Sequence, residues 1–278
     1  GIFDGSTPVG VVVAGQHTSA VVENQSSLSF DGNDDYVDCG GYSSLDNENA
    51  ITIGAWIKTS DPNEEIGFFT KGTGISAPGI ALRIRQGIPA FSARKKDNSD
   101  YWDLYTGTNV LDGQWHYVVG TFNTTSMKRY LDGELEEEII TGQPYLVSSV
   151  NAKIGAGGHV SGYFNGNVDD VTVWNKALTA SEITVLYNSG GLIDASLNSG
   201  DYASANDLVG YWRFAENSGS NAHDISGYGN HGTINGAQWS SSTPPVAGET
   251  TSGDELIEQI TILATQYQSI YSSVLEDG

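Results

Sequence analysis

The sequence predicts an all-β protein, built as a sandwich of two antiparallel sheets, from three observations. Residues 8–190 divide into short runs rich in β-branched and aromatic residues, and turn sequences separate these runs. The chain contains 35 glycines among 278 residues, above the usual share of about 7%. The excess of Ala, Glu, Lys and Leu that is typical of helical proteins is missing.

The individual strands are predicted from alternation along the chain. The run Ile51–Ile57 has an apolar residue at every second position, and Ile80–Ile84 has the same pattern with Arg83 on its other face. The run Trp115–Phe122 is apolar on both faces, as expected for a central strand. Asp132 and Gly133 form a dipeptide that favours a tight hairpin between two strands.

Composition divides the chain into three parts. Residues 1–191 form the predicted sandwich domain, which ends with the strand Val168–Trp174 and a short closing helix over Ala177–Ser189. Residues 192–247 carry further strand and turn signals and end in a linker rich in Ser, Pro and Gly. We expect these strands to complete this sandwich or a neighbouring one, or to begin a truncated second domain.

Residues 248–278 contain the single long helical pattern of the sequence. Apolar residues recur there at alternating spacings of four and three, which predicts an amphipathic helix with a heptad seam. The seam residues are Leu256, Ile260, Leu263, Tyr267, Ile270 and Val274. This helix is expected to pack on the sandwich, to bind a neighbouring chain, or to be partly disordered.

The charge balance excludes one class of partner. The chain has 34 acidic and 12 basic residues, a formal net charge of −22. Phosphate binding needs concentrated Lys and Arg, so nucleic acid is not expected as a partner. No apolar run is long enough to span a bilayer, so membrane insertion is not expected either. The carboxylates either maintain solubility by self-repulsion or, in part, hold divalent cations.

Five motifs in the right order resemble those of bacterial laminin-G-like (concanavalin-A-like) jelly-roll domains. They are Leu28–Asp38, Ile51–Trp56, Gly113–Phe122, Tyr130–Gly133 and Phe164–Thr179. The resemblance implies a two-sheet antiparallel jelly roll with a short closing helix. One departure is that residues 208–239 look like the segment that normally precedes the first motif, yet here they follow the domain. Because a free sheet edge is a liability, such strands are expected to be ordered and paired, in cis or in trans. The cis arrangement is slightly favoured, because the linker at residues 192–206 can double back at high effective concentration.

A calcium site is expected where acidic residues crowd a turn. Asp31, Asn33 and Asp34 lie in this turn, and Asp169 and Asp170 begin the last strand of the domain. Calcium takes six to eight oxygen ligands, so an acidic turn that meets carboxylates from a distant strand suits it, and the resemblance implies calcium near this turn. The alternative is that short polar residues simply form the turn. A weaker second candidate is the glycine-rich loop between Asp224 and Asn230.

A ligand surface is expected where basic and aromatic residues occur together. Aromatic rings stack on sugars, and Arg or Lys can pair with sulfate or uronate groups. The candidate residues are Arg83, Arg85, Arg94, Tyr101, Trp102 and Tyr105. The alternative is that the aromatic residues belong to the core or to the rims of strands.

Glycosidases that share this sandwich place acidic residues at alternating positions on one strand, and Glu134, Glu136 and Glu138 come nearest to that pattern. A solvated hairpin face explains these glutamates better, so the chain is not expected to be an enzyme.

The sequence predicts a calcium-stabilised binding or adhesion module at the cell surface or outside the cell, recognising glycan or a surface protein. The first alternative is a structural subunit of a surface filament or array that binds its own kind through residues 192–278. A polysaccharide-degrading enzyme is the weaker alternative.

Overall fold

The computed structural model describes residues 26–41, 43, 49–62, 65–72, 79–97, 99–145, 150–157, 162–188 and 191–245. The first ten strands are β1 (Ser27–Asp31), β2 (Tyr36–Asp38), β3 (Ala50–Lys58), β4 (Glu65–Lys71), β5 (Ile80–Arg85), β6 (Ile88–Arg94), β7 (Tyr101–Leu104), β8 (Trp115–Asn123), β9 (Ser126–Leu131) and β10 (Glu134–Ile140). The other elements are β11 (Ala152–Ile154), β12 (Asn165–Trp174), α1 (Ala180–Tyr187), a 3₁₀ turn (Ala205–Asp207), β13 (Leu208–Trp212), β14 (Asn221–Ala222), β15 (Gly232–Asn235) and β16 (Gln238–Ser240).

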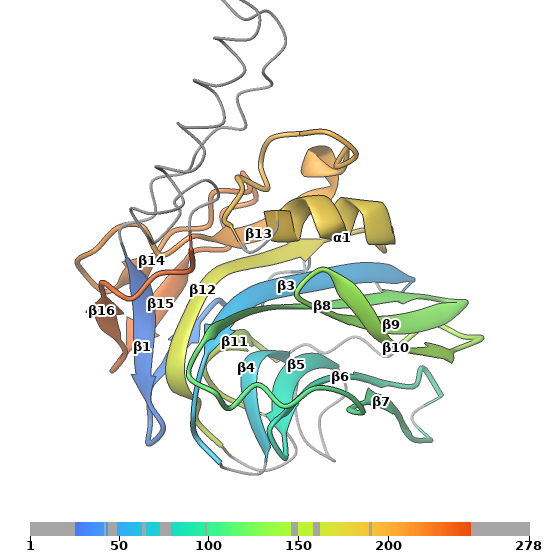
Figure 1. The fold of residues 1–278 in the computed structure, drawn as a ribbon, viewed down its shortest axis with the longest axis horizontal. Coiled ribbons are helices and arrows are strands. Elements are labelled where there is room, and N and C mark those ends of the chain that lie inside the picture. Colours follow the sequence, from blue (N-terminus) through green and yellow to red (C-terminus); the bar gives the residue numbers. More distant parts are fainter. Residues whose placement is uncertain are drawn as a thin grey trace, which may run out of the picture.

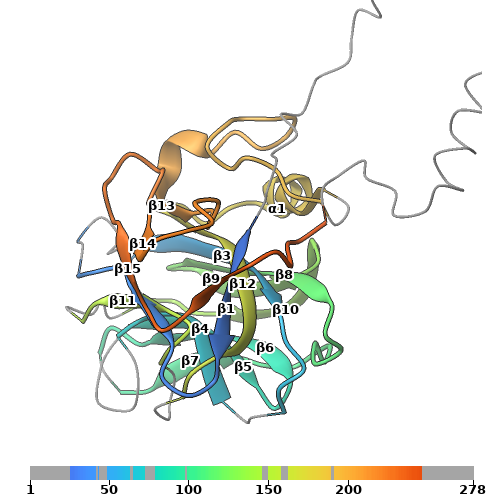
Figure 2. The same cartoon turned by 90° about the vertical axis from the view of Figure 1, so that its left-hand side faces the viewer.

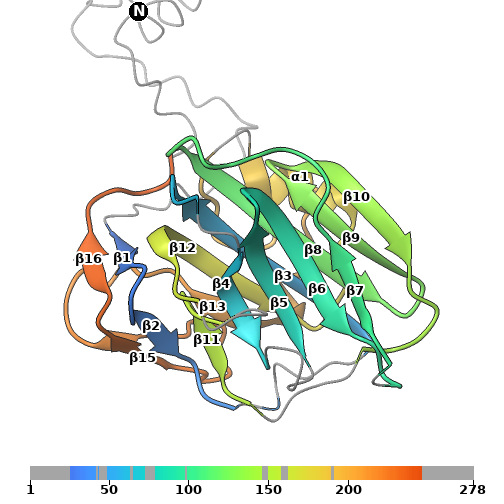
Figure 3. The same ribbon diagram turned by 90° about the horizontal axis from the view of Figure 1, so that it is seen from below.

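These strands form two antiparallel sheets that pack face to face, which confirms the predicted jelly-roll sandwich (Figure 1). The first sheet has the order β10-β9-β8-β3-β12-β1-β16. On the same side of β12 as β1, β13 pairs with Val171–Trp174, past the residue where β1 begins. The second sheet has the order β14-β15-β2-β11-β4-β5-β6-β7. Figure 3 shows β4 to β7 of the second sheet side by side. Consecutive strands form hairpins at β8 to β10 and at β4 to β7, whereas β3–β12, β1–β16 and β2–β15 join distant parts of the chain, as in a jelly roll.

The main core lies between the two sheets, on the faces where the alternation places apolar side chains. Its largest members are aromatic, and several of their rings meet edge to face, as Phe122 and Tyr145 do at 5.2 Å between ring centroids. Leu82 and Ile84 of β5 point into this core, while Arg83 between them points outward. The inner and outer faces of each strand therefore follow the predicted period of two.

A second, smaller core covers the outer face of the first sheet. Here α1 and the segment that follows it pack on Trp56, Tyr117 and Trp174, as Figure 1 shows for α1 above β3 and β12. The helix begins later than predicted. Thr179, one of the caps that the sequence offers, has an extended backbone and forms a capping box with Glu182, which sets the first turn. Outside the helix, the backbone N–H of Leu178 donates to the Thr52 hydroxyl at 2.9 Å.

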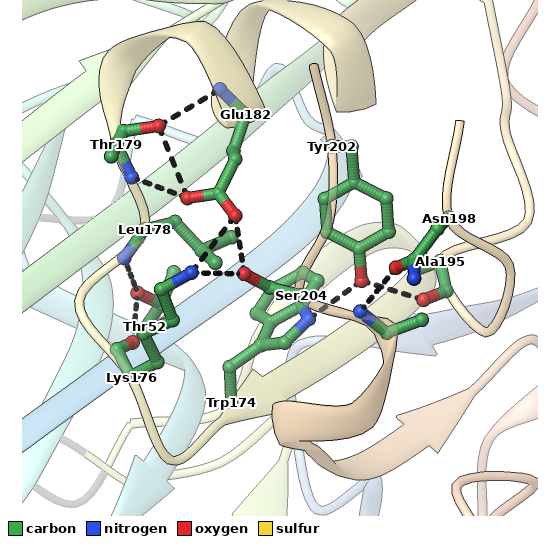
Figure 4. A network of polar contacts seen from close by, with 11 residues as sticks. Thr52, Trp174, Lys176, Leu178, Thr179, Glu182, Ala195, Asn198, Tyr202 and Ser204 are labelled. Atoms are coloured by element: carbon green, nitrogen blue, oxygen red, sulfur yellow. Dashed lines mark hydrogen bonds and ion pairs between the residues drawn. The ribbon is translucent and has the colours of Figure 1, made fainter. Parts of the chain in front are cut away.

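Polar contacts attach α1 to the segment that precedes β13. Glu182 accepts from the Lys176 ammonium at 3.1 Å and from the Ser204 hydroxyl, while Trp174 donates its indole N–H to the Tyr202 hydroxyl at 2.9 Å (Figure 4). These bonds fix residues 194–207 on the outer face of the sheet, so the extension starts from a fixed position before it turns back as β13.

The strands of the extension pair in cis with the sandwich. In the first sheet β13 pairs with β12 and β16 pairs with β1, and in the second sheet β15 pairs with β2. Figure 3 shows β16 beside β1 and β15 beside β2, and Figure 2 shows β15 next to β14. In this structure, residues 192–245 therefore complete the sandwich of their own chain, which is one of the three arrangements that the sequence left open.

The heptad helix expected over residues 248–278 lies outside the described residues. None of the helices in the described ranges is long and apolar enough to cross a membrane.

Candidate functional site

The outer face of the second sheet carries two arginine–tyrosine pairs. Arg94 on β6 faces Tyr101 on β7 in the strand register, and its guanidinium lies 4.4 Å from the centroid of that ring. Arg85 on β5 lies 3.9 Å from the centroid of the Tyr105 ring, just beyond β7. We call Arg85, Arg94, Tyr101 and Tyr105 the basic–aromatic face. All four side chains are partly exposed, so a ligand can reach them from solvent.

Arg83 supports this face from below instead of forming it. The residue is only 1% exposed, and its guanidinium donates to both carboxylate oxygens of Asp103, at 2.8 and 2.7 Å, and to the Ser92 hydroxyl at 2.9 Å. The same carboxylate accepts from Arg85 at 2.6 Å. Asp103 thus holds Arg85 in place from β7, across β6, and Arg83 is too deeply buried to touch a ligand.

The structure places Trp102 in the core, which corrects its assignment to the ligand surface. Trp102 lies between Tyr101 and Asp103 on β7, so the strand's period of two turns its ring inward. The ring packs against Phe122 at 5.5 Å between centroids, and the residue is 7% exposed. The alternation of Tyr101, Trp102 and Asp103 already indicates that Trp102 lies on the opposite face from its neighbours. Grouping the residues by aromatic character alone overlooked this.

The acidic turn between β1 and β2 brings three carboxylates together. One oxygen each from Asp31, Asp34 and Asp35 lies within 4.8 Å of the others. The Asp31 carboxylate accepts two hydrogen bonds from Asn33, one from the side-chain amide at 3.0 Å and one from the backbone N–H at 2.8 Å. These bonds lower the pKa of Asp31. Burial raises the pKa of Asp35, whose carboxylate accepts the backbone N–H of Asp31 at 2.9 Å. The turn therefore combines local hydrogen bonding with carboxylate oxygens of the kind that calcium prefers.

Asp169 and Asp170 do not reach this turn. Asp31 pairs with Asn165 in the β1–β12 ladder, so Asp169 lies four residues further along the strand, about 13 Å away at the usual rise. Asp169 is fully buried opposite Trp56 on β3. Asp170 accepts the Tyr211 hydroxyl at 2.5 Å, so it joins the sandwich to β13. The sequence showed the acidic residues but not the register, and the register decides which of them meet.

The loop that begins at Asp224, the weaker calcium candidate, uses its carboxylate for backbone bonds. Asp224 accepts N–H groups from Tyr211 and Ser226, each at 2.9 Å, and from Asn230 at 2.8 Å. Asn230 donates its amide to the Val209 carbonyl oxygen at 2.5 Å. These residues fold the loop against β13, which accounts for their presence without a metal.

Two of the three glutamates that were weighed as catalytic groups have structural partners. Glu136 lies at a bulge in β10, forms a 2.6 Å ion pair with Arg129, and accepts the backbone N–H of Thr108 at 3.1 Å. Glu138 lies 3.3 Å from the Lys128 ammonium, and Glu134 is exposed. Glu136 thus fastens the connection between β7 and β8 to the edge of the first sheet.

Solved structures similar to this chain share its fold. A candidate carbohydrate-binding protein from Bacteroides ovatus superposes with a TM-score of 0.61 and 16% identity over 82% of this chain, and the match spans 63% of that protein, less than two thirds of its length. The CBM40 domain of the Ruminococcus gnavus IT-sialidase has a TM-score of 0.51 and 16% identity, with coverage of 59% of this chain and 97% of the domain. The same domain bound to α2,3-sialyllactose matches with a TM-score of 0.51, 16% identity, and coverage of 58% and 96%.

Sequence comparison gives the family. A search of curated protein sequences found no match. A family model described as the concanavalin A-like lectin/glucanases superfamily matches residues 31–184, which is more than half of the chain. Of the five sequence motifs named above, this range contains the last four completely and most of the first, Leu28–Asp38. The chain belongs to the concanavalin A-like lectin/glucanases superfamily.

Proposed function

We propose that this protein is a non-catalytic module that binds acidic glycans outside the cell or at its surface. The observation that carries the proposal is the basic–aromatic face, where two arginine–tyrosine pairs lie on the outer side of β5, β6 and β7. Arg85 is opposite Ile88 and Arg94 is opposite Tyr101, so the pairs are about six residues, or about 20 Å, apart along β6 and would contact separate residues of an extended glycan. In a chain with a net charge of −22, two partly exposed guanidinium groups beside aromatic rings on one face of a sheet are distinctive.

The chemistry of the face suits an anionic sugar. A guanidinium group can donate two parallel hydrogen bonds to a carboxylate or sulfate, and the ring beside it offers an apolar surface for a sugar ring. Arg85 is held by Asp103 at 2.6 Å. Because the side chain is already oriented, less conformational entropy is lost when a ligand binds.

The similar structures support this proposal by analogy. The Bacteroides ovatus protein is described as a candidate for carbohydrate binding, and the Ruminococcus gnavus domain is described as bound to sialyllactose, an acidic glycan. Analogy at this level of identity rests on the fold alone, so the basic–aromatic face remains the main argument.

The glutamates of β10 support a binding role over a catalytic one. Glu136 and Glu138 pair with Arg129 and Lys128, whereas glycosidases hold two carboxyl groups across a sugar.

The test is a titration with sialyllactose and with acidic oligosaccharides chosen from a glycan array. Arg94→Ala and Tyr105→Ala should each weaken binding roughly tenfold, as expected when a contact worth about 1.4 kcal/mol is lost. Added salt should weaken binding by the wild type as well, because exposed charges are screened. The measurement is calorimetry on variants with unchanged melting temperatures.

Lys128→Ala is the matched control, because Lys128 is a partly exposed cation on the other sheet. It should bind like the wild type. An array without acidic hits for the wild type, or equal losses for the control and for Arg94→Ala, would remove the basis of the proposal.

We also propose that calcium stabilises the module at the acidic turn. The residues that would hold the ion are Asp31, Asp34 and Asp35, whose carboxylate oxygens already lie within 4.8 Å of one another. A bound cation would offset the repulsion between these charges and would favour the folded state by mass action.

Calorimetric melting in EDTA and in excess calcium tests this proposal. The wild type should melt at a higher temperature with calcium, and Asp34→Asn should lose most of the difference because it removes one charged ligand. Asp201→Asn, an exposed carboxyl on the extension, should keep it. Superimposable wild-type melting curves in both solutions would contradict the calcium site.

A filament built by strand exchange would require β13, β15 and β16 to leave the pairings that they have within the chain, and it stays a prediction. Assembly through residues 248–278 stays a prediction, since those residues lie outside the described ranges.

A further inference from the structure

A polar cavity of about 360 Å³ lies at one end of the first sheet, away from the basic–aromatic face. The end of β3, the loop that follows it, Gly113 and the start of β12 form its walls. The lining residues are Lys58, Thr59, Ser60, Asp61, Pro62, Gly113, Asn165, Gly166 and Asn167. Its volume is near the lower end of the range of about 300–1,000 Å³ for small-molecule sites, which suits a single sugar ring.

Two residues that line the cavity, Lys58 and Asn167, belong to a row of side chains across three strands. Lys58 on β3 pairs in register with Asn167 on β12 and with Trp115 on β8. The period of two places all three on the outer face, one row beyond Trp56. Tyr187 at the end of α1 stacks on Trp56 at 5.9 Å between ring centroids, so the small outer core ends next to this row.

Lys58 is a cation without a carboxylate partner. Its ammonium group makes a 3.3 Å hydrogen bond to the Ser242 hydroxyl, and no acidic group of the described residues lies within ion-pair distance. Lys128 and Lys176, by contrast, each pair with a glutamate. A lysine that remains unpaired in so acidic a protein is available to an anionic ligand.

The walls of the cavity are preformed by hydrogen bonds. Thr59 donates its hydroxyl to the Asn165 carbonyl oxygen at 2.7 Å and accepts the backbone N–H of Asp61 at 3.1 Å, while Gly113 donates to the Thr59 carbonyl oxygen at 3.0 Å. Asn167 donates to the Ser27 hydroxyl at 3.2 Å, which leaves its amide oxygen able to accept from a ligand.

The extension completes this site. Ser27 donates to the Ser242 carbonyl oxygen at 2.7 Å, and Ser242 also accepts from Lys58. The segment after β16 therefore fixes both Lys58 and the partner of Asn167.

We infer that this cavity binds one carboxylate-bearing sugar residue, with the carboxylate at Lys58 and the hydroxyl groups at Asn167, Thr59 and Asp61. A lining that offers both donors and acceptors beside apolar surface matches a sugar ring, which has hydroxyl groups at its edge and C–H groups on its faces. The inference rests on the proposed glycan-binding function and gives it a second subsite, on the other sheet.

The experiment compares D-glucuronate with D-glucose, which lacks the carboxylate, in an NMR titration of the full chain. Both sugars are added to about 50 mM, because a single sugar contributes few contacts and binds in the millimolar range. Glucuronate should shift the amide signals of residues 58–61 and 165–167 saturably and bind at least fivefold more tightly than glucose. Lys58→Met should abolish this preference, and Asn167→Ala should weaken both sugars.

Lys128→Met is the control and should keep the preference. The inference is overturned if glucuronate causes no saturable shift at these amides, if glucose binds equally well, or if an acetylated peptide with a free terminal carboxylate binds more tightly than glucuronate. If acidic oligosaccharides bind through Arg94 and Tyr105 while the cavity signals stay unchanged, the inference fails and the proposed function stands. If neither surface responds to any acidic sugar, both fail.

Discussion

Asp170 carries a buried carboxyl group at the junction of the sandwich and the extension. The residue lies at an irregularity of β12 with a φ of 44°, and the Tyr211 hydroxyl donates to one of its oxygens at 2.5 Å. Among the described residues, its other oxygen has no hydrogen-bond partner. Burial raises the pKa of Asp170 from 3.8 to about 7, although the bond from Tyr211 and the charge of Arg213 act in the opposite direction. The folded state therefore binds this proton more tightly than the unfolded chain does.

This difference predicts how stability changes with pH. The stabilisation from the protonated carboxyl is complete below pH 3.8 and is lost as the pH rises to about 7, because the folded state must then hold a buried charge. Asp170→Asn keeps an acceptor for Tyr211 and stays neutral. In urea unfolding at pH 5 and pH 8, the variant should gain free energy of unfolding relative to the wild type at pH 8. An equal difference between the two proteins at both pH values would contradict this account.

Two residues show what sequence reasoning can reach at this scale. The outward direction of Arg83 followed from alternation, but its depth did not, because burial depends on neighbouring strands that local sequence does not identify. Trp102 could have been placed correctly, since Tyr101 and Asp103 on either side of it mark the opposite face. The acidic turn was visible from its residues, whereas the separation of Asp169 from it depended on the register of β12.

Among the elements, strands with regular alternation were predicted well. The hairpin at Asp132 and Gly133 joins β9 and β10 as expected, and both turn residues have positive φ angles of 50° and 82°. The partner strands of β13 and β16 could not be read from the pattern, because alternation gives the face of a strand and not its neighbour. The closing helix is shorter at its start, since Thr179 has an extended backbone and caps the helix in a capping box with Glu182.

The extension should be essential for folding. Trp212 on β13 is fully buried, packs against Phe69, and donates its indole N–H to the Asn230 carbonyl oxygen at 2.9 Å. Trp212→Ala should lower the free energy of unfolding by about 3–5 kcal/mol. Leu197→Ala, at an exposed position of the extension, should change it by less than about 0.5 kcal/mol.

A chain truncated after Gly191, without the whole extension, also tests whether the extension is needed for folding. It lacks β13, β15 and β16, so it should aggregate or melt early, because edges of both sheets would be exposed. A monomeric fragment as stable as the full chain would show that the extension is an independent appendage.

In the molecule as a whole, the two ends of the described body lie next to each other. Ser27 pairs with Ser240 at the point where β1 begins and β16 ends, and the Ser27 hydroxyl bonds to the Ser242 carbonyl oxygen at 2.7 Å. The sandwich therefore does not depend on whether the extension comes first or last along the chain.

A circularly permuted protein should accordingly fold. Residues 192–245, a short Gly/Ser linker and residues 26–191 in that order would place the extension before the first motif. We expect the same circular dichroism spectrum and a melting temperature close to that of residues 26–245 in native order, because the two ends lie close enough for a short linker to join them. Loss of cooperative melting in the permuted chain alone would show that the native order is required.

The meeting of β1 and β16 also determines how the protein responds to tension. A pulling force applied through residues 26 and 245 would act at the same end of two antiparallel strands. Their hydrogen bonds run perpendicular to the strands, so they would be loaded one after another, as in a zipper, and not all at once in shear. The β1–β16 contact should therefore open at low force. Because Ser242 belongs to this contact and also holds Lys58, the polar cavity would be the first part of the molecule to lose its shape under load.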